Sequence, residues 1–417
     1  MQRAGSGGVP RVAVSGIGTV CGLGWGVDSL WRGLRAGRAA FTLLRRFDAS
    51  RHRTHLAAEV GEPTAELARR IPGWRRLSIA DRFAVFAAAE AVERAGLTLP
   101  LAEGAGVYFG SSTGGMYESE LFFGDFLRDP RRLRLSALAS QQVNGPGDAV
   151  ARHLGVAGPV ETLSSACASG ALALAVALDA VRSGEVEVAV AGGADSLCQL
   201  TYAGFNALRS VDEGPCRPFS AGRAGMSFGE GAAVVVLEPL ERVLARGIEP
   251  LAELAGAGAS CDAHHMTAPD PTGAGAAAAL ERALADAGRT PGDVDFVNVH
   301  GTGTLLNDAA EWQALQRVFD GRAKEIPLVA TKALVGHLLG SSGALEAAAT
   351  VLCLRHGELH PASNGGAPYE TDPNLPVSLV AGEPRPLPEA RTAVSTSLAF
   401  GGSNAALVFS RWMDPTV

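Results

Sequence analysis

The stretch that decides the fold reads Ser164-Ser165-Ala166-Cys167-Ala168-Ser169-Gly170, and a run of small apolar residues follows it as far as Ser183. Small residues around one cysteine predict a tight turn that leads into a buried helix. Because the N-terminus of a helix carries a partial positive charge, we expect the thiolate of Cys167 to be favoured there. The sequence therefore predicts a cysteine nucleophile at the start of a core helix.

Two further segments place histidines in turns that contain glycine. They read His300-Gly301-Thr302-Gly303-Thr304 and Lys332-Ala333-Leu334-Val335-Gly336-His337. Histidines near a nucleophile can handle protons and stabilise an oxyanion during covalent catalysis. Together with Cys167, the two segments predict acyl-transfer chemistry.

Composition sets limits on the class of protein. Among 417 residues, 47% are hydrophobic and 19% charged, which indicates a large buried core. A net charge of −7 gives no reason to expect nucleic acid as a partner. No apolar run approaches the ~20 residues of a membrane span, and the first ten residues lack a signal core, so we expect a cytoplasmic protein. The six cysteines contain no Cys-x-x-Cys pair, so we expect neither a metal site nor disulfides.

The chain repeats itself. Ser169–Leu172 precedes Arg182–Glu185, and Ser342–Leu345 precedes Arg355–Glu358 at the same spacing. Two more correspondences between the halves occur in the same order. A predicted strand precedes the turn at 110–115 and another precedes the turn at 300–304, and Phe-Gly occurs at 228–229 and again at 400–401. Alternating strands and helices predict parallel sheets covered by helices. The helices after Cys167 and after Gly343 have no polar face, so we expect both to be buried between two sheets.

At this point the chain resembles the β-ketoacyl-acyl-carrier-protein synthases, decarboxylating condensing enzymes with the thiolase fold, and their type II branch in particular. The resemblance runs from about residue 11 to 410. It is carried by the motifs Ala166–Gly170, Val299–Thr304 continued by Asn307, Asp308 and Glu311, Thr331–Gly340 followed by Glu346, and Phe400–Asn404. It implies an α/β fold with five layers, α-β-α-β-α, made of two duplicated halves. Residues 10–249 would carry the nucleophile and residues 250–412 the two catalytic histidines.

The resemblance also implies a reaction, the decarboxylative Claisen condensation of an acyl group with malonyl-acyl carrier protein, which lengthens a fatty-acid or polyketide chain by two carbons. Cys167 would hold the acyl group, while its own backbone N–H and that of Phe400 would form the oxyanion hole. His300 and His337 would stabilise the enolate oxygen.

Further roles follow from the same resemblance. Lys332 and Glu346 would fix the position and protonation of the histidines, and Phe400 would act as a gate between the acyl and malonyl sites. Substrate contacts are expected from Thr302, Thr304, Phe205 and Thr113. No cofactor is expected beyond the phosphopantetheine arm that carries the substrates.

The expected partner is an acyl carrier protein. Such carriers are acidic, so this acidic enzyme needs a local basic surface on which they can dock. The candidates are Arg75, Arg76, Arg131, Arg132, Arg134 and Arg209. Any one of these arginines could equally be an ordinary solvent-exposed side chain with no partner role. We expect a homodimer in which a strand near Val186–Ala191 pairs with its twin, or a heterodimer with a chain-length-factor-like homologue.

Other functions fit less well. Gly16-Ile17-Gly18 lacks the spacing of a dinucleotide-binding loop because the next glycine is Gly22. A degradative thiolase would need a second cysteine within residues 397–402, where none occurs, and a chain-length factor would lack Cys167. The pathway stays open between fatty-acid elongation and a type II polyketide or aryl-polyene-type system. Ala168, Leu305-Leu306 and Leu398-Ala399 favour specialised metabolism.

Overall fold

The computed structural model describes residues 9–101, 104–131, 135–363 and 369–413. Within these ranges the core is a 12-stranded sheet with the order β14-β12-β11-β16-β17-β10-β1-β9-β7-β5-β6, and β2 pairs with β1. The first half of the chain contributes β1 (Val12–Cys21), β2 (Gly24–Trp25), β5 (Ala105–Gly110), β6 (Val160–Leu163), β7 (Val188–Asp195) and β9 (Gly231–Pro239). The second half contributes β10 (Ala252–Cys261), β11 (Phe296–Asn298), β12 (Pro327–Val329), β14 (Ser378–Leu379), β16 (Thr392–Leu398) and β17 (Ser403–Ser410).

The remaining elements surround this sheet. Two small sheets pair β3 (Thr42–Leu43), β4 (Leu56–Ala58) and β8 (Phe228–Gly229), and β13 (Glu358–Leu359) with β15 (Arg385–Pro386). The α-helices are α1 (Val27–Arg35), α2 (Ala65–Arg69), α3 (Ile79–Arg94), α4 (Met116–Arg128), α5 (Gly145–Leu154), α6 (Ser169–Ser183), α7 (Gln199–Ala207), α8 (Leu240–Ala245), α9 (Ala274–Asp286), α10 (Leu305–Phe319), α11 (Lys332–Val335) and α12 (Ser342–His356). Short 3-10 helices are η1 (Trp74–Arg76), η2 (Leu135–Leu138), η3 (Pro291–Asp293), η4 (Asp320–Lys324), η5 (Leu339–Ser341) and η6 (Phe400–Gly402).

The two halves of the chain have the same topology. In the first half β5 pairs parallel to β6 and β7, and β9 pairs antiparallel to β7 and β1. In the second half β11 pairs parallel to β12 and β16, and β17 pairs antiparallel to β16 and β10. The halves join where β1 pairs antiparallel with β10. The structure thus has the duplication that the sequence predicts.

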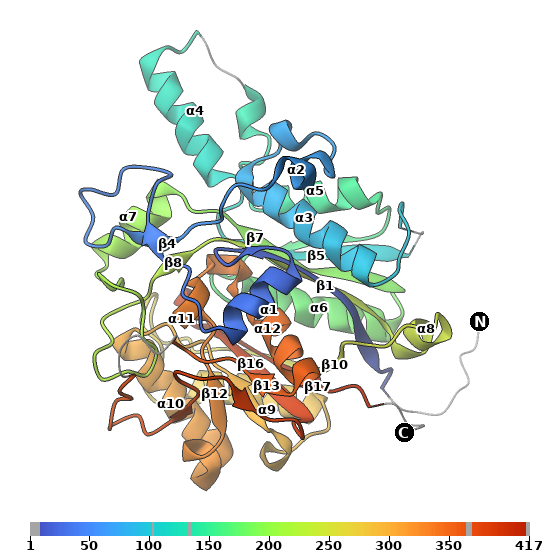
Figure 1. Ribbon diagram of the computed structural model, residues 1–417, viewed down its shortest axis with the longest axis vertical. Helices are drawn as coiled ribbons and strands as arrows, with labels where there is room; N and C mark the ends of the chain where they lie inside the picture. Colours follow the sequence, from blue (N-terminus) through green and yellow to red (C-terminus); the bar gives the residue numbers. More distant parts are fainter. Residues whose placement is uncertain (1–8, 102–103, 132–134, 364–368, 414–417) are drawn as a thin grey trace.

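Helices α6 and α12 form the middle layer. Each contacts the other and strands from both halves of the sheet, α6 through β7 and β10 and α12 through β16 and β9. Outside them, α3 and α5 cover the first half, α9 covers the second half, and α10 packs on α9 (Figure 1). The five-layered α-β-α-β-α prediction is confirmed. By length and composition the stretch Ala166–Ser183 could span a membrane, but here it belongs to this middle layer.

Complete burial is found for one of the two middle helices. Every residue of α12 from Ser342 to Leu354 is buried. Helix α6 differs, because Leu172, Ala175 and Val176 are half-buried and Asp179 is exposed. These positions repeat every three or four residues and therefore form one stripe. The expectation of burial on all sides is wrong for this stripe of α6.

Close packing explains the glycines of the first strand. A Cβ atom on Gly16 would lie 2.1 Å from the carbonyl oxygen of Ala91, and one on Gly18 would lie 2.0 Å from that of Ala87. Both positions therefore let α3 lie directly on β1. Gly16-Ile17-Gly18 is a packing feature of a strand, which removes the reason to consider a dinucleotide site there.

The strand at the free edge of the sheet in the first half of the chain differs from the one that the sequence predicts. Strand β7 pairs on one side with β5 and on the other with β9, so the expected pairing of a strand near Val186–Ala191 with its twin is wrong. Strand β6 ends the sheet order, and its four residues are exposed or half-buried. An added strand would pair with β6.

Candidate active site

Cys167 lies in the turn between strand β6 and helix α6. Ala166 before it has a φ of 44°, a strained value for a residue with a Cβ atom. The carbonyl oxygen of Ala166 accepts hydrogen bonds from the hydroxyls of Ser169, at 2.6 Å, and Ser112, at 3.0 Å. Two hydroxyls therefore hold the backbone of the strained turn directly before Cys167.

The electrostatic setting of Cys167 differs from the expectation. Burial raises the pKa of its thiol to about 11, although Lys332 and the backbone N–H groups of Phe400 and Cys167 itself act in the opposite direction. Burial therefore outweighs the local preference for the thiolate that the helix N-terminus predicts. The same two N–H groups that oppose this rise are the ones expected to form the oxyanion hole.

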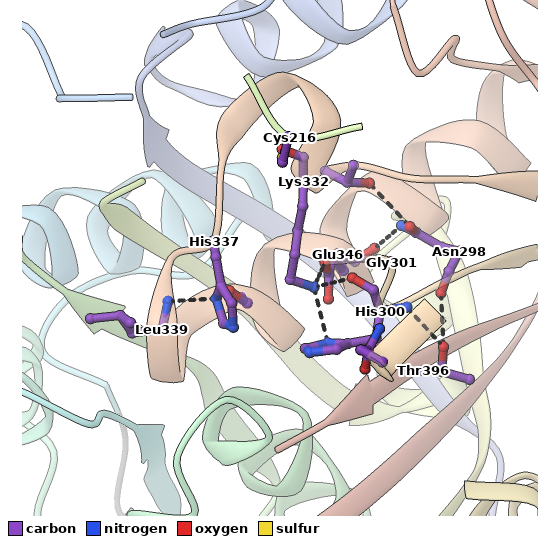
Figure 2. Close-up of polar contacts among 12 residues, drawn as sticks. Cys216, Asn298, His300, Gly301, Lys332, His337, Leu339, Glu346 and Thr396 are labelled. Carbon is purple, nitrogen blue, oxygen red and sulfur yellow. Dashed lines mark hydrogen bonds and ion pairs between the residues drawn. The ribbon is translucent and has the colours of Figure 1, made fainter. Parts of the chain in front are cut away.

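His300 is held by carboxylate and ammonium groups at the end of β11. Its backbone N–H donates to Glu311 at 2.7 Å, and Lys332 Nζ donates to its carbonyl oxygen at 2.7 Å. Lys332 Nζ also lies 3.0 Å from His300 Nδ1 and forms a buried ion pair with Glu346 (Figure 2). Since the ammonium can only donate, Nδ1 accepts and the ring proton is on Nε2.

His337 reaches the same tautomer through backbone contacts. Its Nδ1 accepts from the backbone N–H of Leu339 at 3.0 Å and lies 2.8 Å from the hydroxyl of Ser342 (Figure 2). Nδ1 therefore carries no proton, and Nε2 is the donor. The backbone of His337 is anchored to the first half of the chain, because its N–H donates to Ser227 and its carbonyl oxygen accepts from Gly229.

Both imidazoles are neutral donors. Burial and the nearby Lys332 hold the pKa of each ring well below its usual value, and His337 adds to the effect on His300. The ring centroids lie 5.5 Å apart with an interplanar angle of 87°. Two Nε2–H groups of neutral rings can stabilise one developing oxyanion without a change in protonation.

A cavity of about 350 Å³ joins the three predicted groups, because Cys167, His300 and His337 all line it. Thr302 and Thr304 line it too, with their hydroxyls 3.0 Å apart. So do Phe400, the predicted gate, and Phe205, a predicted substrate contact, whose rings stack with 5.2 Å between their centroids.

Thr113 is elsewhere. Its hydroxyl donates at 2.9 Å to Asp195, and it is not among the residues that line the cavity. Its side chain satisfies a buried carboxylate and does not line this cavity, so the expected substrate contact of Thr113 stays a prediction.

The predicted docking arginines do not form one group around the cavity. Arg209 lines the mouth, Arg75 and Arg76 lie on η1, and Arg131 follows α4. Arg132 and Arg134 lie outside the described residues. Of the described candidates, Arg209 is the one whose position places it at the substrate entrance.

Two buried carboxylates hold the site in ways that the sequence did not predict: Glu311 was placed in the His300 motif without a role, and Asp195 was missed. Glu311 also accepts from the N–H of Gly301 at 2.8 Å and the hydroxyl of Thr396 at 2.8 Å, so it supports the His300 turn. Asp195 accepts from the backbone N–H of Ser112 at 3.0 Å, beside the Cys167 turn. The signal for Asp195 is a charge that ends the apolar strand β7. For Glu311 it is a position about two helical turns after Thr304, the last residue of the His300 turn.

A buried cysteine beside two neutral imidazole donors, on a duplicated five-layered fold, defines the class of thiolase-fold enzymes that form carbon–carbon bonds through an acyl-cysteine. Family models for the N-terminal and C-terminal domains of beta-ketoacyl synthase match residues 10–242 and 251–365. The chain belongs to the beta-ketoacyl synthase family and is an acyltransferase of the condensing-enzyme type.

Relatives and solved structures agree over nearly the whole chain. Nodulation protein E of Rhizobium meliloti is 36% identical, covering 96% of this chain and 99% of the relative. The 3-oxoacyl-[acyl-carrier-protein] synthase 2 of Staphylococcus aureus is 34% identical, covering 96% and 98%. The structure titled the ishigamide ketosynthase/chain length factor has a TM-score of 0.91 at 34% identity, covering 97% and 100%. A type II polyketide ketosynthase solved with its acyl-carrier protein has a TM-score of 0.88 at 25% identity, with the same coverage.

Proposed function

We propose that Cys167 attacks an acyl thioester presented by an acyl carrier protein and keeps the acyl group as a new thioester, while the pantetheine thiol leaves. A malonyl thioester then enters and loses CO2, and its carbanion attacks the Cys167 thioester carbonyl. The carbon–carbon bond forms as the sulfur of Cys167 leaves. The product is a β-ketoacyl thioester two carbons longer, still attached to the carrier.

One observation carries this proposal. His300 and His337 line the same cavity as Cys167 and carry their ring protons on Nε2, and burial together with Lys332 keeps both rings neutral. Two neutral donors suit the enolate oxygen that develops as the malonyl group loses CO2. A general base would need a pKa near the working pH, whereas the pKa of each ring is lowered. We therefore assign enolate stabilisation, and not proton abstraction, to both histidines.

A second candidate function is the ketosynthase subunit of a type II polyketide or aryl-polyene-type system, paired with a chain-length-factor-like partner. It is supported by the ketosynthase/chain length factor structure at 34% identity. The free edge of β6 and the half-buried stripe of α6 give either partner, a second copy or a homologue, a surface to bind. In both cases the enzyme needs no cofactor beyond the phosphopantetheine of its substrates and works in the cytoplasm.

The test is intact-mass analysis of the enzyme after incubation with acyl carrier proteins of fatty-acid and polyketide systems, each loaded with acyl groups of several lengths. The expected result is a gain of one acyl group that is absent from Cys167→Ala, followed by loss of that mass when malonyl carrier protein is added. Acylation by the chain alone supports the homodimer. Acylation that needs an added chain-length-factor-like subunit supports the second candidate. No acylation under either condition contradicts the proposal.

A further inference from the structure

Asp195 is a buried carboxylate that the reaction proposed above does not use. It ends strand β7 and is 1% exposed. Its Oδ1 accepts from the hydroxyl of Ser111 at 2.8 Å and from the N–H and hydroxyl of Thr113 at 2.8 Å and 2.9 Å. Both of its oxygens accept from the N–H of Ser112, at 3.0 Å and 3.1 Å. Burial raises the pKa of Asp195, and the groups that oppose this rise are neutral donors of the same three residues. The carboxylate therefore serves one turn, directly after strand β5.

The second half of the chain has the same arrangement at the His300 turn. The turns correspond, because β5 and β11 each pair with two parallel strands in their own half. Glu311 accepts from the N–H groups of His300 and Gly301 and from the hydroxyl of Thr396. In each half a buried carboxylate thus binds two consecutive N–H groups of this turn and a hydroxyl. The second turn presents a histidine to the cavity, whereas none of residues 111–113 lines it. The first turn must therefore act on the site through another segment.

The hydroxyl of Ser112 makes this contact. It donates at 3.0 Å to the carbonyl oxygen of Ala166. This carbonyl and the N–H of Cys167 belong to one planar trans peptide, so the two groups point in opposite directions and turn together. The N–H of Cys167 acts on its own sulfur and lowers the pKa of the thiol, so it faces the reacting atom. A hydrogen bond to the Ala166 carbonyl therefore also fixes the direction of the Cys167 N–H.

The Ser112 contact ties the nucleophile turn to the sheet. Ala166 is strained, with a φ of 44°, and such a conformation persists only where its surroundings hold it. The hydroxyl and N–H of Ser169 also donate to the Ala166 carbonyl, but they belong to the same turn. Ser112 adds a contact from a different segment. A Cβ atom on Gly340 would lie 2.7 Å from both Ser112 Oγ and Asp195 Oδ2, so the backbone of η5 packs directly against these two groups.

We propose that Asp195 and Ser112 are positioning residues for the oxyanion hole. Asp195 fixes the turn at 111–113, Ser112 fixes the Ala166 carbonyl, and the peptide so held aims the N–H of Cys167 at the oxygen of the acyl group. This rests on the proposed function, because an oxyanion forms there when Cys167 attacks the donor thioester and again when the carbanion attacks the acyl-cysteine. A donor that is aimed in advance stabilises an oxyanion more than one that must reorient.

The test compares two reactions of the same sulfur. Acylation, by the acyl carrier protein that acylates Cys167 in the experiment above, passes through an oxyanion. Alkylation by iodoacetamide displaces iodide and forms no oxyanion. The variant is Ser112→Ala, and the matched control is Ser119→Ala, which removes a buried hydroxyl that donates to the carbonyl oxygen of Gly115 at 3.1 Å. Single-turnover intact mass follows both reactions, with Cys167→Ala as the background.

Ser112→Ala should slow acylation about tenfold, the effect of one hydrogen bond, and change the alkylation rate less than about twofold. Ser119→Ala should keep both rates. Asp195→Asn keeps the shape of the side chain but places an amide NH2 beside the N–H of Ser112. It should also slow acylation about tenfold. Alkylation should not fall in this variant, because the charge of Asp195 raises the pKa of the Cys167 thiol.

A double variant tests whether the two residues act through one contact. Ser112→Ala with Asp195→Asn should acylate no more slowly than either single variant, since the second change has nothing left to disturb. Additive losses would show that Asp195 acts independently of Ser112.

Two further outcomes overturn the proposal. Unchanged acylation in Ser112→Ala means that the hydroxyl does not aim the Cys167 N–H. Equal losses of acylation and alkylation mean that it supports the fold around Cys167 and not the oxyanion hole. Failure of the proposed function looks different, because the unmodified enzyme would then not be acylated by any carrier.

Discussion

Lys332 Nζ lies 3.0 Å from His300 Nδ1 while it also pairs with the carboxylate of Glu346. Burial raises the pKa of Glu346 to about 7, and the neighbouring Lys332 opposes this rise. The Lys332 side chain thus holds His300 in the Nε2–H tautomer and also forms the ion pair with the buried carboxylate of Glu346. The chemistry assigned to His300 depends on this ammonium, although Lys332 does not line the cavity itself.

Replacing Lys332 with methionine tests this dependence. We expect Lys332→Met to slow condensation about 100-fold, because His300 can then carry its proton on Nδ1 and no longer donate from Nε2. Acylation of Cys167 should fall much less, since it does not use the enolate contact. Single-turnover rates for the two steps measure the split, and Lys324→Met, on an exposed lysine, is the control. Equal losses in both steps would show that Lys332 acts on the fold or on Cys167 instead.

The pH dependence of Cys167 follows from its raised pKa. Below a pKa of about 11, the thiolate fraction grows tenfold for each unit that the pH rises. We expect the rate of alkylation of Cys167 by iodoacetamide to rise about tenfold per pH unit from pH 7 to 10 without a plateau. Intact mass follows the reaction, and Cys167→Ala gives the background from exposed Cys261. A plateau near pH 8 would mean that Lys332 and the helix N-terminus outweigh burial.

The sequence predicted the architecture because the signals are local and occur twice. Small residues in α6 and α12 and the short apolar runs of β1 and β9 indicate buried elements whatever their partners. Cys167, His300 and His337 were found in the same way, since each lies in a short motif at the end of an element. The motifs therefore indicated three residues that the fold brings to one cavity, Cys167, His300 and His337.

Long-range properties could not be predicted in this way. The pKa of Cys167 depends on how deeply other segments bury it. The role of Thr113 depends on Asp195, which lies 82 residues away in the chain. Which strand ends the sheet depends on the order of pairing, so β7 was taken for the edge that β6 occupies. Each of these properties depends on a contact between distant segments, for which one sequence holds no periodic signal.

Glu311 should be as important for His300 as Lys332 is, although it holds the backbone and not the ring. We expect Glu311→Gln to lower the free energy of unfolding by about 1–3 kcal/mol, because the amide NH2 would face one of the donors that the carboxylate now accepts. Condensation should slow about tenfold with little change in the KM of the acyl donor. Thermal melting and single-turnover kinetics measure the two effects. Glu281→Gln, on an exposed position of α9, is the control. A melting temperature lowered without any change in condensation would show that Glu311 supports stability alone.

Gly110 shows how closely the nucleophile turn is packed. It ends strand β5, and a Cβ atom there would lie 2.4 Å from the backbone nitrogen of Gly170 and from the backbone carbon of Ser169. These atoms belong to the first turn of α6, which cannot move without moving Cys167. We expect Gly110→Ala to destabilise the enzyme by about 1–3 kcal/mol or more and to slow acylation of Cys167 about tenfold.

The matched control for this change is Gly124→Ala on α4, where a Cβ atom would meet nothing within 4 Å. Alanine in a helix interior loses less backbone freedom on folding than glycine, so this variant should gain about 0.5–1 kcal/mol and acylate normally. Chemical denaturation and the rate of acyl-enzyme formation compare the two variants. Normal acylation by Gly110→Ala, despite the lost stability, would mean that α6 tolerates a shift of its first turn. The strained Ala166 turn would then position Cys167 independently of strand β5.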